Sequence, residues 1–388
     1  MLASLGFEEG HFPFRYLGIP LNSSRLTSSM FQPLLHKLRC SISHWSSMFL
    51  SYTGRSQLIN SVVFGIENFW FSSLLIPLGI MRQLNGFCKR FLWQAMEGQR
   101  KMVFKSWSSS CRPRDEGGFG IKEVFAWNKP LLLRWVCWLH FSRHNIWCRW
   151  VQAYLLRHED VWSVQPRHNS PGSWHGILRV RDDFVSRAGS VSSATSLLIS
   201  WYMADRFDVS SAYDFFRDKS RPVFWAKTVW YSLNIPRHSY ISALAAQAKL
   251  ATVDNICIRG LSIPNRCILC KAAAKNHQHL FFQCPVSHAV WGAILSWLRL
   301  PVRRWSLMRE LRWFRVHIWE RHWSSTWSRC ALTATIYTVW AERNFRTFKD
   351  AERSVDCLVR AVKFFVSVRM LGFSSSLFYD EIVDCLNS

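Results

Sequence analysis

The hydrophobic residues in the first hundred positions recur with the spacing of one helix face. Between positions 27 and 49 they fall every three or four residues, and Ser28 or Ser29 stands where an N-cap is expected. A second pattern of this kind runs over 55–75 and ends before a proline, and a third covers about 79–93. Three successive amphipathic helices predict a small helical domain.

The pattern changes after position 100. The short segments KMVFKSW and FGIKEV flank the turn-rich CRPRDEGG, which predicts a β-hairpin near residue 110. Helical spacing resumes near Trp127, where Pro130 is tolerable only near a helix start. Residues 166–200 are rich in Ser, Gly and Arg and are interpreted as a poorly structured connector. A compact segment is expected over about 207–300, and a helical region after it. The expected fold class is therefore mainly α.

Composition adds a strong positive charge to this helical pattern. Hydrophobic residues make up 49% of the 388 positions, so the chain can bury the cores of two or three modest domains. Lys and Arg number 49 against 25 Asp and Glu, which gives a net charge of +24. Such an excess favours a polyanion as partner, and nucleic acid is the commonest one. A membrane surface is the weaker alternative, because the basic residues are dispersed rather than set on one amphipathic helix.

The chain shows no targeting or membrane-spanning signal. Its start, MLASLGFEEGHF, has neither a basic n-region nor a long apolar h-region, and the most apolar stretch, 68–81, contains a proline and is too short to span a bilayer. The 12 cysteines are spread through a long chain, unlike those of a small secreted disulfide scaffold. We therefore expect an intracellular protein, in which clustered Cys and His indicate metal binding.

The most specific local signal is the segment CILCKAAAKNHQHLFFQC. Cys267 and Cys270 form a C-x2-C pair, and His279 and Cys284 follow at compact spacing. Zinc favours four such ligands in a tetrahedron, and four protein ligands leave no position for water, so we expect a structural Zn²⁺. His277 remains an alternative to His279, although the spacing to Cys284 and the apolar LFF that follows favour His279. The competing interpretation is a group of free cysteines beside an incidental histidine.

Several segments resemble one protein family, and they occur in the family's order. The segments FDVSSAYDFFRD, VFWAKTVWYSLNIPRHSYISALAAQAKLATVDNICIRG and CILC…HQHLFFQCPVSHAVW resemble the zinc-binding domain that follows the polymerase in LINE-type (non-LTR) retrotransposon reverse transcriptases, which are common in plant genomes. GFEEGHFPFRYLGIPL, SYTGRSQLINSVV and IPLGI are similar to the thumb-side end of the polymerase, EGGFGIKEVFAWNKPLLLRW to the linker, and VWAERNFRTF to the helix after the zinc module.

The resemblance implies five parts. These are a thumb-like C-terminal end of the reverse transcriptase at 1–98, a hairpin and helical linker at 99–165, an irregular connector at 166–204, the zinc-binding domain at 205–300 and a C-terminal helical region at 301–388. The chain departs from the family in AGSVSSATSLLISWYMADR, which holds no equivalent of a usual G-x-G…FW-x-D-x-W stretch. Ala243 also stands where Trp is usual, and Pro130 replaces a small helix former.

The carboxylates of a polymerase are not recognisable in this sequence. A polymerase adds nucleotides with the help of two metal ions, which are held by carboxylates. In the family that the chain resembles, a paired Asp follows an aromatic residue in a hairpin, and that hairpin should lie upstream of residue 1. Asp182–Asp183 lacks the aromatic residue, follows the thumb-like region and is flanked by arginine on an expected helix, so it is interpreted as a solvated charged turn. We therefore expect the chain not to be an enzyme and to have no small-molecule substrate.

Charge and resemblance together predict a truncated, non-catalytic fragment that binds RNA or DNA. A location in the nucleus is implied by the resemblance alone. Six basic residues are candidates for phosphate contacts: Arg15, Arg25 and Arg55 in the thumb-like part, and Arg266, Lys271 and Lys275 around the metal loop. A protein-interaction scaffold stapled by zinc and a decaying element fragment without retained function are the alternatives. The preference between RNA and DNA and the oligomeric state stay open.

Overall fold

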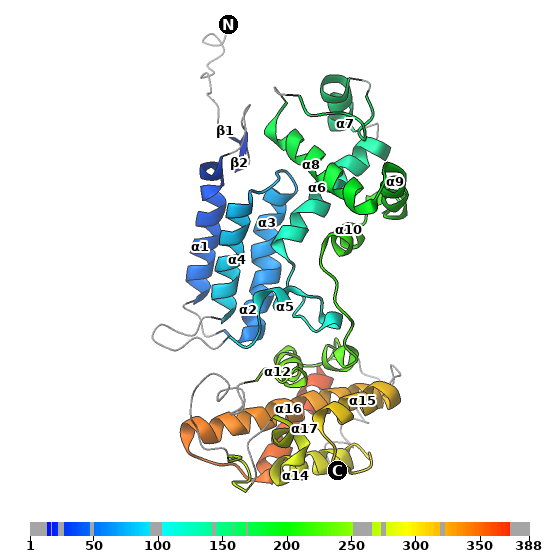
Figure 1. The fold of residues 1–388 in the computed structure, drawn as a ribbon. Helices are drawn as coiled ribbons and strands as arrows, with labels where there is room; N and C mark the ends of the chain where they lie inside the picture. Colours follow the sequence, from blue (N-terminus) through cyan, green and yellow to red (C-terminus); the bar gives the residue numbers. More distant parts are fainter. Residues whose placement is uncertain are drawn as a thin grey trace. The chain divides into compact units, whose positions relative to one another are not determined.

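The computed structural model describes residues 14–16, 18–21, 27–46, 50–93, 103–141, 145–157, 159–167, 170–250, 266–272, 277–318 and 323–372. These residues are mainly helical, as the sequence predicts, and the chain divides into two compact units (Figure 1). Unit 1 comprises Met1–Leu50, Gly54–Lys101 and Ile121–Lys219, and unit 2 comprises Ser51–Thr53, Met102–Gly120 and Ser220–Ser388. The five-part division of the sequence remains a prediction.

The helices predicted for the first hundred residues are confirmed. A two-stranded antiparallel hairpin, β1 (Phe14–Tyr16) and β2 (Ile19–Leu21), turns at Gly18 with a φ of 87°. The chain then forms the 3₁₀ turn η2 (Ser28–Phe31), α1 (Gln32–Ser46), α2 (Tyr52–Leu58), the π-turn η3 (Ile59–Val63), α3 (Phe64–Phe71) and α4 (Leu78–Trp93). Helices α1, α3 and α4 lie side by side in Figure 1, because their apolar stripes face one another.

The second half of unit 1 is built around α6 (Val124–Phe141). It continues with α7 (Ile146–Val151), the π-turn η5 (Gln152–Leu156), α8 (Gly172–Ala188), α9 (Val191–Ser200), the hairpin of β3 (Tyr202–Met203) and β4 (Arg206–Phe207), and α10 (Val209–Phe216). Contrary to expectation, Pro130 lies in the second turn of α6 and is buried. A proline there removes one backbone donor, and the buried packing of α6 against α8 and α10 offsets that loss.

The prediction of an irregular connector over 166–204 is wrong, because the helices α8 and α9 occupy most of these residues. Serine favours turns since its hydroxyl competes for backbone groups, but here the hydroxyls bond within the helix. Ser196 Oγ, for example, donates to the carbonyl of Ser192 at 3.0 Å. Gly189 ends α8 with a φ of 88°, and Ser190 caps α9 by accepting from the amide of Ser193.

The β-hairpin expected near residue 110 is also misplaced. The described residues of that segment form the helix α5 (Trp107–Cys111) and the 3₁₀ turn η4 (Arg114–Glu116), with Ser106 as the N-cap of α5. The loop closes on itself, since the amide of Phe119 donates to the carbonyl of Ser110 at 3.0 Å. The two hairpins within the described residues are β1–β2 and β3–β4.

Unit 2 is a bundle of long helices that positions the cysteine and histidine residues. Besides α5 and η4, it contains α11 (Ala226–Val229), α12 (Pro236–Ala246), the π-turn η6 (His279–Gln283), α14 (Pro285–Trp297), α15 (Leu307–His317), α16 (Trp323–Lys349) and α17 (Val355–Leu371). Helices α12 and α14 pack against α16 and α17. Ala243 is fully buried in α12, so a small side chain suits the close approach of these helices.

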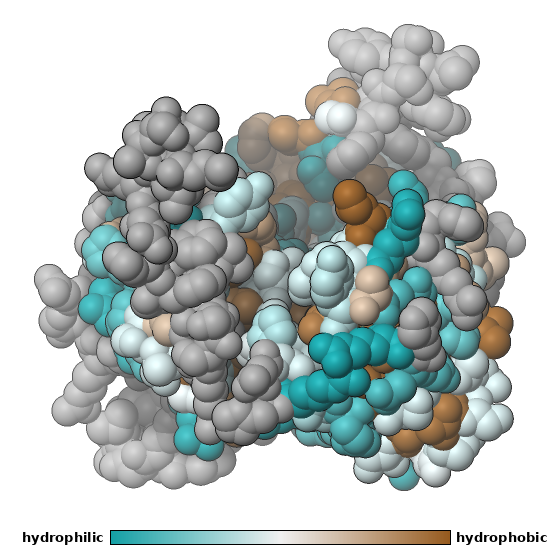
Figure 2. Space-filling model, turned by 90° about the horizontal axis from the view of Figure 1, so that it is seen from above, coloured by the Kyte–Doolittle hydropathy of each residue, from teal (hydrophilic) through white to brown (hydrophobic). Residues whose placement is uncertain are grey.

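Among the described residues, no helix combines the length and the apolar character needed to cross a bilayer. The face drawn in Figure 2 mixes hydrophilic and hydrophobic residues, with the hydrophobic ones in separate patches. Isolated exposed apolar residues of this kind are ordinary on protein surfaces.

Candidate metal centre

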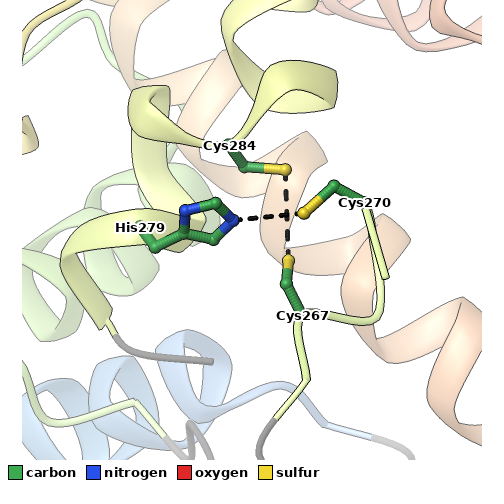
Figure 3. Close-up of side chains that lie close together, drawn as sticks. All are labelled: Cys267, Cys270, His279 and Cys284. Atoms are coloured by element: carbon green, nitrogen blue, oxygen red, sulfur yellow. Dashed lines mark hydrogen bonds between the residues drawn. The ribbon is translucent and has the colours of Figure 1, made fainter. Parts of the chain in front are cut away.

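The structure brings together the four residues that the sequence singled out. One ligand atom each of Cys267, Cys270, His279 and Cys284 lies within 4.8 Å of all the others. The sulfurs of Cys267 and Cys284 are 4.0 Å apart, and Cys270 Sγ lies 3.3 Å from His279 Nε2. Figure 3 shows the four side chains converging on one point from two separate backbone segments. Thiolates about 2.3 Å from a zinc ion stand about 3.7 Å apart in a tetrahedron, so these spacings fit a metal ion.

A tight turn aims the first two sulfurs in one direction. The amide of Lys271 donates to the carbonyl of Cys267 at 2.7 Å and closes the turn. Lys271 itself adopts the left-handed conformation with a φ of 59°. Leu269 is buried in the middle of the turn and anchors it to unit 2.

A second reversal of the backbone places His279 and Cys284 beside the first two cysteines. The amide of Cys284 donates to the carbonyl of His279 at 2.7 Å, and between them Phe282 has a φ of 68°. Phe281 and Phe282 are fully buried, which anchors the segment as the apolar LFF predicted. Cys284 then serves as the N-cap position of α14, which begins at Pro285.

The electrostatics of the cluster favour a thiolate at Cys267. The hydrogen bond between the Cys267 and Cys284 sulfurs, together with the backbone amides of Leu269 and Cys270, lowers the pKa of Cys267 despite burial. The same hydrogen bond raises the pKa of Cys284, and burial raises it further. One sulfur of the pair is thus prepared for a cation, since a thiolate is the form that binds metal.

His277, the alternative ligand, lies outside the cluster. Its ring is buried against Phe281, with the ring centroids 5.2 Å apart. The four-residue cluster contains His279. Its geometry therefore favours His279 over His277.

The sequence analysis missed an arginine that ties the cysteine turn to α16. Arg346 Nη1 donates to the carbonyl of Leu269 at 3.1 Å. The same guanidinium bonds through Nε to Glu342 at 2.8 Å and through Nη1 to Glu352 at 3.1 Å. Glu342 is fully buried and also accepts from the amide of Arg353 at 3.0 Å. The available signal was Glu342, an acidic residue four positions before an arginine on the buried side of a helix.

Four of the six basic candidates lie within the described residues, two in each unit. Arg15, Arg266 and Lys271 are exposed. Arg55 is half-buried and donates to the carbonyl of Phe91 at 3.4 Å. Arg25 and Lys275 lie outside the described residues.

The aspartate pair lies on the helix α8, where both residues form ion pairs. Asp182 pairs with Arg181 at 2.6 Å. Asp183 pairs with Lys129 at 2.9 Å and with Arg187 at 3.3 Å. Both carboxylates are therefore used in ion pairs of unit 1.

Two comparisons relate the sequence of this chain to known proteins. Residues 207–291 match the family described as zinc-binding in reverse transcriptase. The chain carries a domain of this family. The match begins at β4, ends in α14 and contains all four residues of the cluster, whereas Arg346 lies beyond it.

The second comparison is with a curated plant protein. The chain is 26% identical over 171 residues to a putative ribonuclease H protein of Arabidopsis thaliana. The alignment covers 43% of this chain and 27% of that protein, so the chain spans about a quarter of its relative. Together, the two likenesses support the predicted resemblance to a retroelement reverse transcriptase.

Proposed function

We propose that this chain is a non-catalytic, nucleic-acid-binding fragment of a LINE-type reverse transcriptase, stapled by one structural zinc ion. Cys267, Cys270, His279 and Cys284 would hold the ion. The proposal rests on their convergence within 4.8 Å inside the region that matches the zinc-binding family. When bound, zinc supplies a cross-link between the two backbone segments.

The donor set supports a structural ion rather than a catalytic one. Three sulfurs and one imidazole complete a tetrahedron and leave no position for water. Cys267 and Cys284 are buried, which limits access to the ion further. The aspartate pair of α8 is bound to basic side chains, which supports a role without polymerase chemistry.

Nucleic acid is the partner that best fits the charge. A net charge of +24 attracts polyanions, and the exposed residues Arg266 and Lys271 flank the cysteine turn. Guanidinium and ammonium groups beside the metal would contact phosphates, while the ion fixes the loop that carries them.

Metal analysis of the purified chain tests the zinc part of the proposal. We expect one zinc per chain, lost in the variant Cys270→Ser and retained in Cys357→Ser, which changes a half-buried cysteine outside the cluster. Equal zinc loss in both variants, or no zinc in the unchanged chain, would contradict the assignment.

Filter binding over a salt series tests the nucleic-acid part. With about six phosphate contacts, affinity should fall on the order of a thousandfold between roughly 50 and 200 mM salt. Affinity that does not change with salt would exclude the proposed partner.

A further inference from the structure

The segment from Arg299 to His317 concentrates positive charge beyond the region that matches the zinc-binding family. It contains six arginines and a single acidic residue, Glu310. Helix α15 buries one side, formed by Leu307, Glu310, Leu311 and Phe314. Its remaining surface carries Arg309, Arg312 and Arg315, which are all exposed. We call these three residues the α15 arginine face.

Aromatic rings hold guanidinium groups in place along this segment. Arg309 lies over Trp305 with its Cζ 4.4 Å from the ring centroid. Arg303 lies between two indoles, 4.9 Å from Trp305 and 3.7 Å from Trp313. Arg312 lies over Phe224, two residues before α11, with its Cζ 5.2 Å from the ring centroid. Stacking of this kind restricts the guanidinium planes before any ligand arrives.

The acidic residue of the segment forms its ion pair with an arginine outside the face. Glu310 is fully buried and pairs with Arg303 at 3.1 Å, and Arg303 is itself nearly buried. In the described part of the chain, no carboxylate forms an ion pair with Arg309, Arg312 or Arg315. Like charges three residues apart on a helix repel one another. An external anion bound to the face would therefore reduce the repulsion between its arginines.

The face is joined to the metal centre through packed groups. Arg304 Nη2 donates to the carbonyl of Gln283 at 2.8 Å, directly before Cys284. Phe282 stacks on Trp291 at 5.0 Å, and the Trp291 ring lies 6.0 Å from that of Phe314 in α15. A metal ion that fixes residues 279–284 would thus also fix the base on which α15 rests.

We infer that the α15 arginine face binds the phosphate backbone of nucleic acid. The inference rests on the proposed function and names the surface that performs it. Guanidinium groups suit phosphate because their fork of donors matches its oxygens, and rings that restrict them reduce the entropy lost on binding. The contacts carry no base specificity, since they reach only the backbone.

The test compares two triple variants of the full chain in binding a single-stranded RNA oligonucleotide. The first is Arg309→Gln, Arg312→Gln and Arg315→Gln. The control removes the same charge from exposed arginines of unit 1, by Arg149→Gln, Arg179→Gln and Arg206→Gln. At about 100 mM salt the α15 variant should bind about a hundredfold more weakly, with a salt slope smaller by about 2, because each contact contributes about 0.7 to the slope. The control should lose several-fold at most.

The outcomes separate the inference from the function on which it rests. If the unchanged chain does not bind RNA, the proposed function fails. If it binds and the two triple variants weaken equally, the face is not the site. If the α15 variant retains its RNA affinity but loses binding to anionic lipid vesicles or to polyglutamate, the face serves another polyanion and the inference is overturned. Zinc content equal to that of the unchanged chain shows that the α15 variant is folded.

Discussion

Arg346 Nη1 donates to the carbonyl oxygen of Leu269 at 3.1 Å and so joins α16 to the middle of the cysteine turn. The arginine is held in turn by Glu342, which is fully buried, and by the exposed Glu352. The candidate metal centre therefore depends on residues beyond the region that matches the zinc-binding family.

Arg346→Ala should weaken zinc binding without removing a ligand. The Leu269 carbonyl loses its donor and Glu342 becomes a buried, under-compensated carboxylate, so stability should fall by about 3 kcal/mol. Chelator competition should show a zinc affinity about tenfold lower, and the cobalt-substituted spectrum should broaden as the turn loosens. Arg346→Lys should retain part of the stability and part of the zinc affinity, since a lysine ammonium can still bond to one of the partners of Arg346.

The matched control is Arg360→Ala, which removes an exposed arginine from α17. It should leave zinc affinity and the cobalt spectrum unchanged. If Arg346→Ala lowers thermal stability but binds zinc as tightly as this control does, the bond from Arg346 to Leu269 stabilises the fold and does not position the cysteine turn.

Substitution of the two histidines should separate the ligand from its neighbour. His279→Ala should abolish the tetrahedral cobalt spectrum, whereas His277→Ala should keep it and lose only the packing of the ring against Phe281. His279→Cys should retain a tetrahedral site with four sulfurs. A normal spectrum in His279→Ala together with its loss in His277→Ala would assign the ligand to His277 instead.

Glu67 should make unit 1 less stable as the pH rises. The side chain is fully buried on α3, both carboxyl oxygens lack a hydrogen-bond partner among the described residues, and burial raises its pKa to about 8. In the unfolded chain it ionises near 4.5, so stability is fully present below that pH and is lost progressively as the pH approaches 8. At pH 7 the loss is about 3 kcal/mol, at about 1.4 kcal/mol per pH unit.

Glu67→Gln should therefore raise the melting temperature at pH 7 and change it little near pH 4.5. The measurement is thermal unfolding of both proteins across that range. A melting temperature difference that does not vary with pH would show that Glu67 is not a buried neutral acid.

Gly118 is required by a close approach of two backbone segments. A Cβ atom at this position would lie 1.8 Å from the carbonyl oxygen of Arg112. Gly118→Ala should lower the free energy of unfolding by at least about 2 kcal/mol, because backbone must move. Gly86→Ala on α4 is the control and should be neutral or stabilising by up to about 1 kcal/mol, since its nearest contact is the end of the Arg90 side chain at 3.7 Å. Equal effects in urea unfolding would contradict this reading of the loop.

The sequence predicts features that depend on near neighbours in the chain. The helices of the first hundred residues follow from apolar spacing, and the cluster from Cys267 to Cys284 spans only one turn, one short connection and one reversal. Such local geometry depends little on the rest of the fold.

The remaining features depend on tertiary packing. Ser196 and Ser200 of α9 donate to carbonyls of their own helix, which composition alone does not show, so the segment resembled a connector. The contact of Arg346 with Leu269 joins positions 77 residues apart, and no local pattern encodes it. The α15 arginine face is visible in the sequence only as an arginine-rich segment, because the contact of Arg312 with the distant Phe224 comes from tertiary packing.

X-ray absorption at the zinc edge of the purified chain tests the central claim most directly, because it counts the atoms around the metal. The proposed site predicts one zinc per chain, bound by three sulfurs at about 2.3 Å and one imidazole nitrogen at about 2.0 Å. A shell of oxygen and nitrogen alone, or zinc far below one per chain, would contradict the assignment of Cys267, Cys270, His279 and Cys284 as its ligands.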